Sequence, residues 1–273
     1  MVDIGTNYKY DTQVNNCYKY TTDKVDASLL SNRPMRLVTK TPFTKRNVVS
    51  YGLMVYAMDS HRWLIVRRKH SAEFVLIMKG NYKPVHLLFL LSRITITEKD
   101  IIKECIKSKN IFTYVYKDIF HNYIDTDYKY SLVRFMENRH FISGIIDKVY
   151  CGNLNWTWPK GRPDGGPNKE DGYSCALREF EEEASIALPE PIYKSPIPYS
   201  DCFRSVIGRT IETRCWLYII DKEISVPKVL DDNHEICNRK WLSTIEIMEN
   251  LEGGQLKMLT ECMPIVTKYV STI

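Results

Sequence analysis

The sequence Trp156-Thr-Trp-Pro-Lys-Gly-Arg-Pro leads into a Gly/Pro-rich loop that ends at Glu170, and Arg178-Glu-Phe-Glu-Glu-Glu183 follows. At about 100° per residue, a helix over 173–184 places its apolar residues on one side. Residues three and four apart are neighbours on a helix, so the other side gathers Glu179, Glu182 and Glu183. The stretch therefore predicts a helix with an apolar back and three clustered carboxylates.

Like charges four residues apart repel each other on a helix. Hard divalent cations take several carboxylate oxygens at about 2.0–2.6 Å, so the helix would suit Mg²⁺ or Mn²⁺. Arg178 lies one turn before Glu182 and can hold its carboxylate in place. The alternative is a solvated acidic face, which is the commoner fate of a glutamate run.

The pattern of Glu170, seven residues, Arg-Glu, two residues and Glu-Glu resembles the Nudix box, here spanning 161–186. The resemblance implies an α+β fold, a Nudix-type α/β/α sandwich with a mixed sheet, interrupted by an inserted helical domain. Two departures concern glycines. The family's first glycine would fall on Asp164, so that Gly161 is the better counterpart, and Ser185 stands where a glycine is usual.

The flanking residues are similar to the viral mRNA-decapping Nudix enzymes of African swine fever virus, poxviruses and giant viruses. The similarity rests on Trp156-x-x-Pro-Lys-Gly161, on Cys175 to Glu183, on Val66 to Ala72 and on Asn233-His-Glu-Ile236. It implies a viral hydrolase acting in the host cytoplasm with Mg²⁺ or Mn²⁺. Such an enzyme removes the 5′ cap of mRNA, releases m7GDP and 5′-monophosphate RNA, and contributes to host shutoff.

The resemblance also assigns roles to the carboxylates. Glu179 and Glu183 become metal ligands, Glu182 a further ligand, and the Gly161 carbonyl a candidate ligand. Glu235 is a candidate general base or extra ligand, and Glu179 and Glu182 complete the catalytic set. Glu212 is a weaker candidate for such a role, and Glu170 is expected to anchor the loop through a basic residue.

Basic and aromatic residues are candidates for contacting the substrate. Lys160 is expected to meet phosphate, and Trp156 or Trp158 could stack on a base, although tryptophans in a strand are more often core. The remaining candidates are basic residues around the insertion, of which the three lysines have helical spacing: Arg67, Arg68, Lys99, Lys103 and Lys107. An ordinary mixed surface is the alternative, because acidic residues lie among the lysines.

The chain has 273 residues, is 44% hydrophobic and 26% charged, and carries a formal net charge of +5. These values are typical of a globular protein and exclude a disordered chain or a coiled coil. No apolar run is long enough for a membrane span, and the first residues do not resemble a signal peptide. We therefore expect no membrane partner.

We divide the chain into an N-terminal extension (1–45), a Nudix domain (46–70 plus 147–273) and a helical insertion (71–146) with a candidate RNA-binding surface. Within these, a hairpin is expected over 48–67. A capped helix is expected to start at Thr97, followed by Asp100. The last helical stretch is expected to break at Pro264.

Two other functions remain open from the sequence. One is hydrolysis of a diphosphoinositol polyphosphate, nucleotide or other small phosphoanhydride, which needs only a compact basic pocket. The other is an inactive RNA-binding module on the same scaffold, against which the intact glutamates argue. The sequence leaves the oligomeric state open.

Overall fold

The computed structural model describes residues 48–121, 123–153, 156–165, 170–205, 208–226 and 235–272. All of them belong to one compact unit, Lys45–Ile273. The predicted N-terminal extension lies outside the described residues, as do Asn233 and His234.

The central sheet is built on a hairpin. Strands β1 (Val48–Ala57) and β2 (Arg62–Arg68) pair antiparallel, with Val55 opposite Leu64, so the predicted hairpin is confirmed. Strand β7 (Thr210–Ile220) runs parallel to β1 along its whole length. The sheet is therefore mixed, as predicted.

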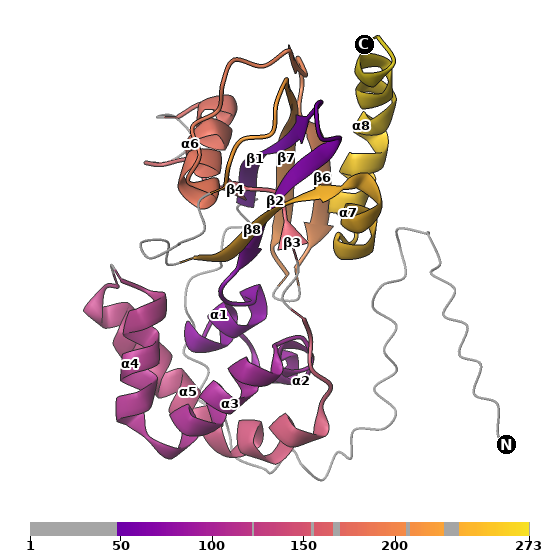
Figure 1. The fold of residues 1–273 in the computed structure, drawn as a ribbon. Helices are drawn as coiled ribbons and strands as arrows, with labels where there is room; N and C mark the ends of the chain where they lie inside the picture. Colours follow the sequence, from indigo (N-terminus) through magenta and orange to yellow (C-terminus); the bar gives the residue numbers. More distant parts are fainter. Residues whose placement is uncertain are drawn as a thin grey trace, which may run out of the picture. The chain divides into compact units, whose positions relative to one another are not determined.

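Shorter strands complete the sheet, which has eight strands within the described residues (Figure 1). Strands β3 (Trp156–Thr157) and β8 (Ile236–Ser243) pair with β2, and β4 (Lys160–Gly161) pairs with β1. Strands β5 (Tyr193–Lys194) and β6 (Tyr199–Arg204) pair with β7. This arrangement brings the start of the box, on β4, against the centre of the sheet.

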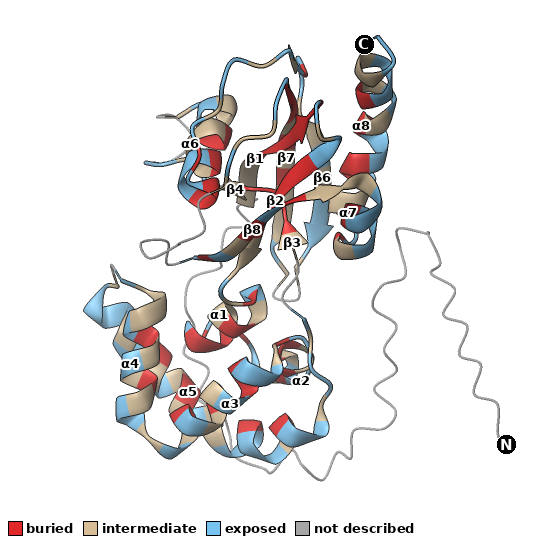
Figure 2. Cartoon of the chain, in the orientation of Figure 1, coloured by how far each residue is buried: buried red, intermediate tan, exposed pale blue. Residues whose placement is uncertain are grey.

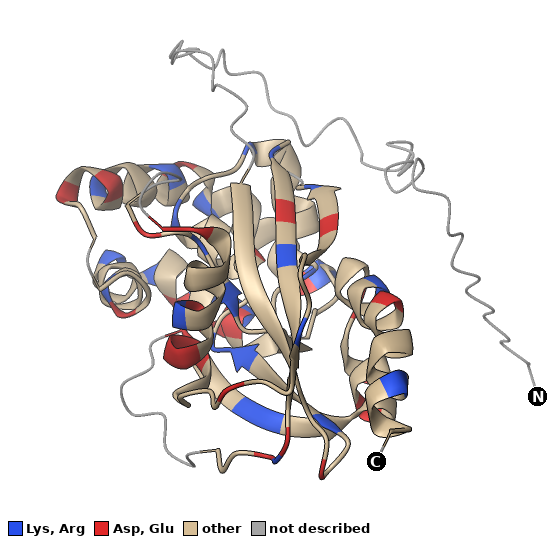
Figure 3. Ribbon diagram, turned by 90° about the horizontal axis from the view of Figure 1, so that it is seen from above, with Lys and Arg blue, Asp and Glu red and all other residues tan. Residues whose placement is uncertain are grey.

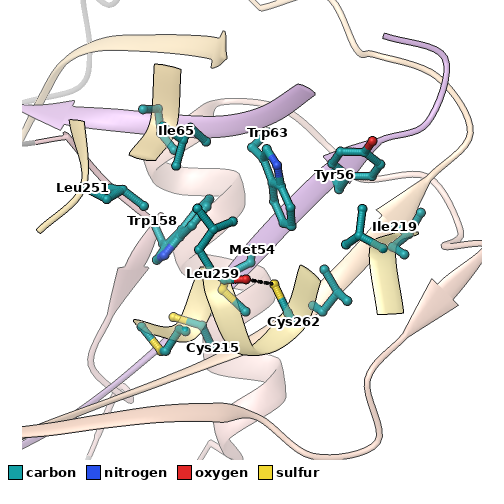
Figure 4. Packing of buried hydrophobic residues seen from close by; sticks show 14 of the residues in the cluster. Met54, Tyr56, Trp63, Ile65, Trp158, Cys215, Ile219, Leu251, Leu259 and Cys262 are labelled. Atoms are coloured by element: carbon teal, nitrogen blue, oxygen red, sulfur yellow. Dashed lines mark hydrogen bonds between the residues drawn. The ribbon is translucent and has the colours of Figure 1, made fainter. Parts of the chain in front are cut away.

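Helices cover both faces of the sheet, because side chains alternate between its faces along each strand. Helix α6 (Gly172–Ala184) packs Phe180 against Leu53 and Val55 on one face. Helices α7 (Thr244–Asn250) and α8 (Gly254–Val270) cover the other face (Figure 1). There Trp63 and Trp158 are fully buried, with ring centroids 5.7 Å apart (Figure 4). The predicted α/β/α sandwich is confirmed.

The chain between β2 and β3 is helical. Its elements are α1 (Ala72–Met78), η2 (Pro84–His86), α2 (Leu87–Leu91), α3 (Ile96–Lys107), α4 (Lys109–Ile119), α5 (Asp125–Ile145) and η3 (Ile146–Lys148). They enclose an apolar cluster of their own, in which the rings of Phe112 and Phe135 lie 4.8 Å apart (Figure 2). The proposed division into domains stays a prediction.

Two helix boundaries differ from those expected. Helix α3 is capped by Thr95, whose side chain accepts from Glu98 N while Glu98 accepts from Thr95 N, so the capping box lies two residues before Thr97. Pro264 does not break the C-terminal helix but lies inside α8. The chain breaks instead at 251–253, where Gly253 has a φ of +56°. No helix in the described part of the chain is both long and apolar enough to cross a bilayer.

Candidate active site

Helix α6 is fixed at both ends. Asp171 caps its N-terminus by accepting hydrogen bonds from Tyr173 N and Ser174 N at 2.9 and 3.0 Å. At its C-terminus Ser185 adopts the left-handed conformation, with φ 53° and ψ 40°, which explains why a glycine is usual there. The buried Phe180 and Ala184 hold the helix on the sheet, so its other side meets β4 and the loop that follows it.

The Glu179 carboxylate lies where a side chain on residue 161 would be. A Cβ built on Gly161 would lie 2.0 Å from Glu179 Cδ. Burial raises the pKa of Glu179, and the Arg178 guanidinium acts against this rise. Gly161 thus allows a carboxylate to lie directly against the backbone of β4.

Glu183 is buried, with only 5% of its surface exposed, so the alternative of a solvated acidic face is wrong for this residue. Its Oε2 accepts a hydrogen bond from Lys160 N at 2.9 Å, because β4 passes over this end of α6. Burial raises the pKa of Glu183 to about 7, while the positive charges of Arg68 and Lys160 oppose the rise. The site therefore holds a carboxylate whose charge is only partly compensated.

Arg178 organises the exposed edge of the site. It binds both carboxylate oxygens of Glu170 at 3.0 Å, which confirms Glu170 as the anchor of the loop. It also contacts Glu179 Oε1 at 3.0 Å and Glu182 Oε2 at 3.1 Å, and it donates to Arg162 O at 2.9 Å. One guanidinium thus joins the loop to two of the predicted ligands.

The remaining carboxylates lie at different depths. The Glu182 side chain is 58% exposed and shares the Arg178 guanidinium with Glu179. Glu235 is exposed just before β8, and its negative charge contributes to the raised pKa of Glu179, so it lies within electrostatic reach of the cluster. Glu212 pairs with Arg214 at 2.7 Å on β7, and nothing in the described contacts links it to the cluster.

Lys160 and Arg68 lie on the inner side of the cluster. Lys160 Nζ donates to Thr157 Oγ1, and burial lowers the pKa of Lys160 to about 8, with Arg68 adding repulsion. Arg68 is half-buried, and its Nε has no hydrogen-bond partner. Both predicted phosphate contacts therefore lie beside Glu183.

Arg67 points to the other face of the sheet. Its guanidinium lies 6.0 Å from the ring centroid of Trp156, which is its partner across the strands, and Lys240 Nζ lies 5.6 Å from the same ring. Trp156 is half-buried against the core, whereas Trp158 is fully buried and serves as core. The structure thus separates Trp156 and Arg67 from the glutamate cluster.

The expected stripe of three lysines on α3 is wrong as an exposed basic surface. Lys99 is only 4% exposed and donates to Val149 O and Tyr150 O at 2.5 and 2.9 Å, because α3 packs against the end of η3. Lys103 pairs with Asp147 at 2.6 Å, and Lys107 pairs with Glu104 at 2.6 Å. Acidic and basic residues are interspersed on the described helices (Figure 3).

One residue of the site region escaped the sequence analysis. Arg239 on β8 is buried, and its Nη1 donates to Ala184 O at the C-terminal end of α6. Cations near a helix C-terminus are stabilising. Side chains two residues apart on a strand share a face, so Arg239 lies on the α6 face with Trp241. This alternation in the sequence could have identified Arg239 as a residue facing α6.

Among the described residues, no three His, Cys, Asp or Glu side chains are gathered in position to hold a metal ion. The oxygen donors that the contacts between α6 and β4 bring together are the carboxylates of Glu179 and Glu183 and the carbonyl of Gly161. All are hard oxygen donors, and burial raises the pKa of both carboxylates, although Glu179 is only partly buried. A divalent cation fits this chemistry, because it would compensate the negative charges of the two carboxylates, which repel each other.

Comparisons with known proteins point to viral enzymes. The chain is 28% identical over 173 residues to mRNA-decapping protein g5R of a Kenyan isolate of African swine fever virus, covering 55% of this chain and 66% of the relative. The same protein from a Namibian isolate is 26% identical over 177 residues, covering 56% and 67%. The match thus spans about two thirds of the relatives' length. No protein-family model matches the chain.

Among solved structures, the Ap4A hydrolase of C. elegans, in a binary complex, aligns with a TM-score of 0.42 at 14% identity, over 81% of this chain and 98% of that one.

Proposed function

We propose that this chain, which resembles the viral Nudix hydrolases that remove mRNA caps, is a metal-dependent hydrolase of the 5′ cap that releases m7GDP and 5′-monophosphate RNA. The observation that carries the proposal is the pair of carboxylates on α6, of which Glu183 is buried and Glu179 is partly buried. Glu179 fills the space beside Gly161, and Glu183 accepts from Lys160 N at 2.9 Å. Two like charges on one helix are costly to desolvate, and the pKa of Glu183 stays raised despite Arg68 and Lys160, so a bound cation would offset this cost.

Glu179 and Glu183 would hold Mg²⁺ or Mn²⁺, with the Gly161 carbonyl and Glu182 as further ligands. A bound divalent cation screens the charges of the phosphate bridge and lowers the pKa of a water nucleophile. The protein supplies the position of the carboxylates, through Asp171 and Ser185 at the ends of α6 and through Arg178 at its exposed edge.

The bridge of capped RNA is polyanionic, so cations beside the carboxylates would bind it. Lys160 and Arg68 lie there, and both act on the pKa of Glu183. Glu235 lies on the exposed side of the cluster, within electrostatic reach of Glu179. An exposed carboxylate in that position suits a general base, which takes a proton from the attacking water.

The test compares three substrates with Mn²⁺ present: cap-labelled RNA, free cap dinucleotide and a diphosphoinositol phosphate. We expect release of m7GDP from RNA at the highest rate. Preferential cleavage of a small substrate would replace decapping by small-phosphoanhydride hydrolysis. RNA binding without cleavage of any substrate would indicate an inactive binding module.

Glu183→Gln is the variant that connects activity to the site. We expect cleavage to fall by more than about 100-fold, together with loss of the thermal stabilisation by Mn²⁺, because the amide is a poor ligand for a hard cation. Glu181→Gln is the matched control, since Glu181 lies on the same helix and is exposed. A folded Glu183→Gln variant with the turnover of the Glu181→Gln control would refute the assignment.

A further inference from the structure

A pocket of about 380 Å³ lies where the end of β2 meets the start of α3. Its lining includes Arg67, Lys69 and His70 from β2 and the segment after it, Thr97 from the first turn of α3, and Asn153 from the segment before β3. This volume is within the range of sites for small ligands, which begins at about 300 Å³. Nothing in the proposed reaction uses it.

The walls of the pocket are fixed by hydrogen bonds. Gly152 N donates to Ile94 O at 2.8 Å, and a Cβ on Gly152 would lie 1.9 Å from Arg93 O. The buried Glu98, also in the lining, accepts from Ser71 N at 2.6 Å and from Thr95 N at 2.8 Å. The pocket therefore needs no rearrangement of its backbone to receive a ligand.

Several buried nitrogen atoms of the lining have no hydrogen-bond partner. They are Arg67 Nε and both ring nitrogens of His70. His70 Nδ1 lies 3.9 Å from Glu98 Oε1, which is too far for a hydrogen bond, and the Glu98 carboxylate already accepts from backbone and hydroxyl donors. Burial lowers the pKa of His70, so its neutral ring carries one N–H donor in addition to that of Arg67 Nε. Buried donors without partners are costly, so an acceptor beside these two would stabilise them.

The charges around the pocket favour an anion. Arg67 and Lys69 bring two positive charges. The amides of Ile96 and Thr97 lie at the positive end of α3, beside the Glu98 amide that Thr95 already caps. Glu98 is the negative group in the lining, and Asp118 lies 3.3 Å from Lys69 Nζ at the exposed rim. Arg67 also lies over Trp156, so a ligand held by Arg67 would be beside an aromatic ring.

The Arg67 side chain lies on a different face of β2 from the glutamate cluster, whereas Lys69 N, also in the lining, donates to Glu235 O at 2.7 Å. Arg67 shares the face of Trp63 and Ile65, which pack under α8, whereas Arg68 acts on Glu183 on the face of α6. From this geometry we propose that the pocket is a second anion site that binds a phosphate group through Arg67, His70 and the first turn of α3. The phosphate belongs either to the body of an RNA or to a free phosphate compound.

The test measures binding without added metal, so that hydrolysis does not enter. The probes are a 5′-phosphorylated, uncapped oligoribonucleotide, followed by fluorescence anisotropy at several salt concentrations, and inorganic phosphate, followed by calorimetry. Two variants are designed to keep the fold. Arg67→Gln removes one donor, and Thr97→Glu places a carboxylate at the exposed first turn of α3, where a negative charge favours the helix.

We expect each variant to weaken binding by at least about tenfold. For the oligonucleotide, Arg67→Gln should also reduce the salt slope by about 0.7, the value for one phosphate contact on a single strand. Arg62→Gln is the matched control, because Arg62 begins the same strand and pairs with Glu223 instead. Loss of RNA binding alone identifies the phosphate as that of RNA, and a parallel loss of inorganic phosphate binding identifies a site for free phosphate compounds.

Unchanged binding of both probes by Arg67→Gln and Thr97→Glu, relative to Arg62→Gln, would overturn the proposal. The role of the site in holding capped RNA rests on the proposed function, but anion binding does not. Failure of the wild-type chain to cleave capped RNA would therefore refute decapping and leave this pocket to be judged by the binding data.

Discussion

The Glu179 carboxylate lies where the side chain of Gly161 would begin, with Cδ 2.0 Å from the Cβ position. The glycine thus sets how close a charged group of α6 comes to β4. Any larger residue has to push the carboxylate away from the backbone carbonyl that is proposed to share its metal.

Gly161→Ala should therefore lower cleavage by about 10²-fold, the scale for a misplacement of about 1 Å, while the chain still folds. Steady-state cleavage and circular dichroism would measure the two effects. Gly144→Ala is the control, since no atom lies within 4 Å of its Cβ position inside α5. That change should leave activity intact and stabilise the helix by up to about 1 kcal/mol. Equal activity of the two variants would show that the Glu179 position does not matter.

Glu235→Gln separates a base from a ligand. If Glu235 removes a proton from water, turnover should fall by about 10²–10⁴ while metal affinity changes little. Single-turnover cleavage and Mn²⁺ titration would measure the two quantities. A large loss of Mn²⁺ affinity would make Glu235 a ligand instead, and no change in either would exclude both roles.

The Arg178–Glu170 contact predicts a dependence of stability on pH. The Arg178 hydrogen bonds lower the pKa of Glu170 to about 2, below its value in an unfolded chain. The contact therefore stabilises the fold fully at neutral pH, and this contribution is lost as the pH falls from about 5 to about 2. In Arg178→Gln, thermal unfolding midpoints between these pH values should fall less steeply than in the wild type. Arg62→Gln is the control, because Arg62 pairs with Glu223 and not with Glu170. Its unfolding midpoint should fall with pH as steeply as that of the wild type. Parallel curves for all three proteins would contradict the assignment.

Lys99 should contribute to the stability of the fold and not to RNA binding. In Lys99→Ala the carbonyls of Val149 and Tyr150 lose their buried donor, which should cost about 1–3 kcal/mol in the free energy of unfolding. Lys107→Ala should cost less than about 0.5 kcal/mol, because Lys107 is exposed. Chemical denaturation would measure both. A Lys99→Ala variant of wild-type stability but weaker RNA binding would restore the surface role expected from the sequence.

The parts of the structure that could be predicted are those set by local periodicity. The β1–β2 hairpin and helix α6 follow from alternation and from helical spacing over fewer than twenty residues. Glu170 could be predicted as an anchor because the Arg178 that binds it belongs to the same motif.

Burial of individual charges could not be predicted, because it depends on distant segments. Glu183 is covered by β4, and Lys99 is covered by the segment around Val149, some fifty residues along the chain. Helical spacing alone made both residues look exposed. Pro264 shows the same limit, since the packing of α8 on the sheet keeps the helix continuous through a residue that disfavours it locally.

Arg67 and Trp156 face each other across neighbouring strands, although the whole helical segment separates them in the chain. The segment thus leaves and rejoins the sheet about one strand spacing apart, near 4.8 Å. The two strands would have the same positions in the sheet whether the segment that connects them were long or short. The entropic cost of closing such a connection grows slowly with its length. The helices between these strands can therefore be exchanged or shortened, in evolution or by design, with little change at the carboxylates of α6.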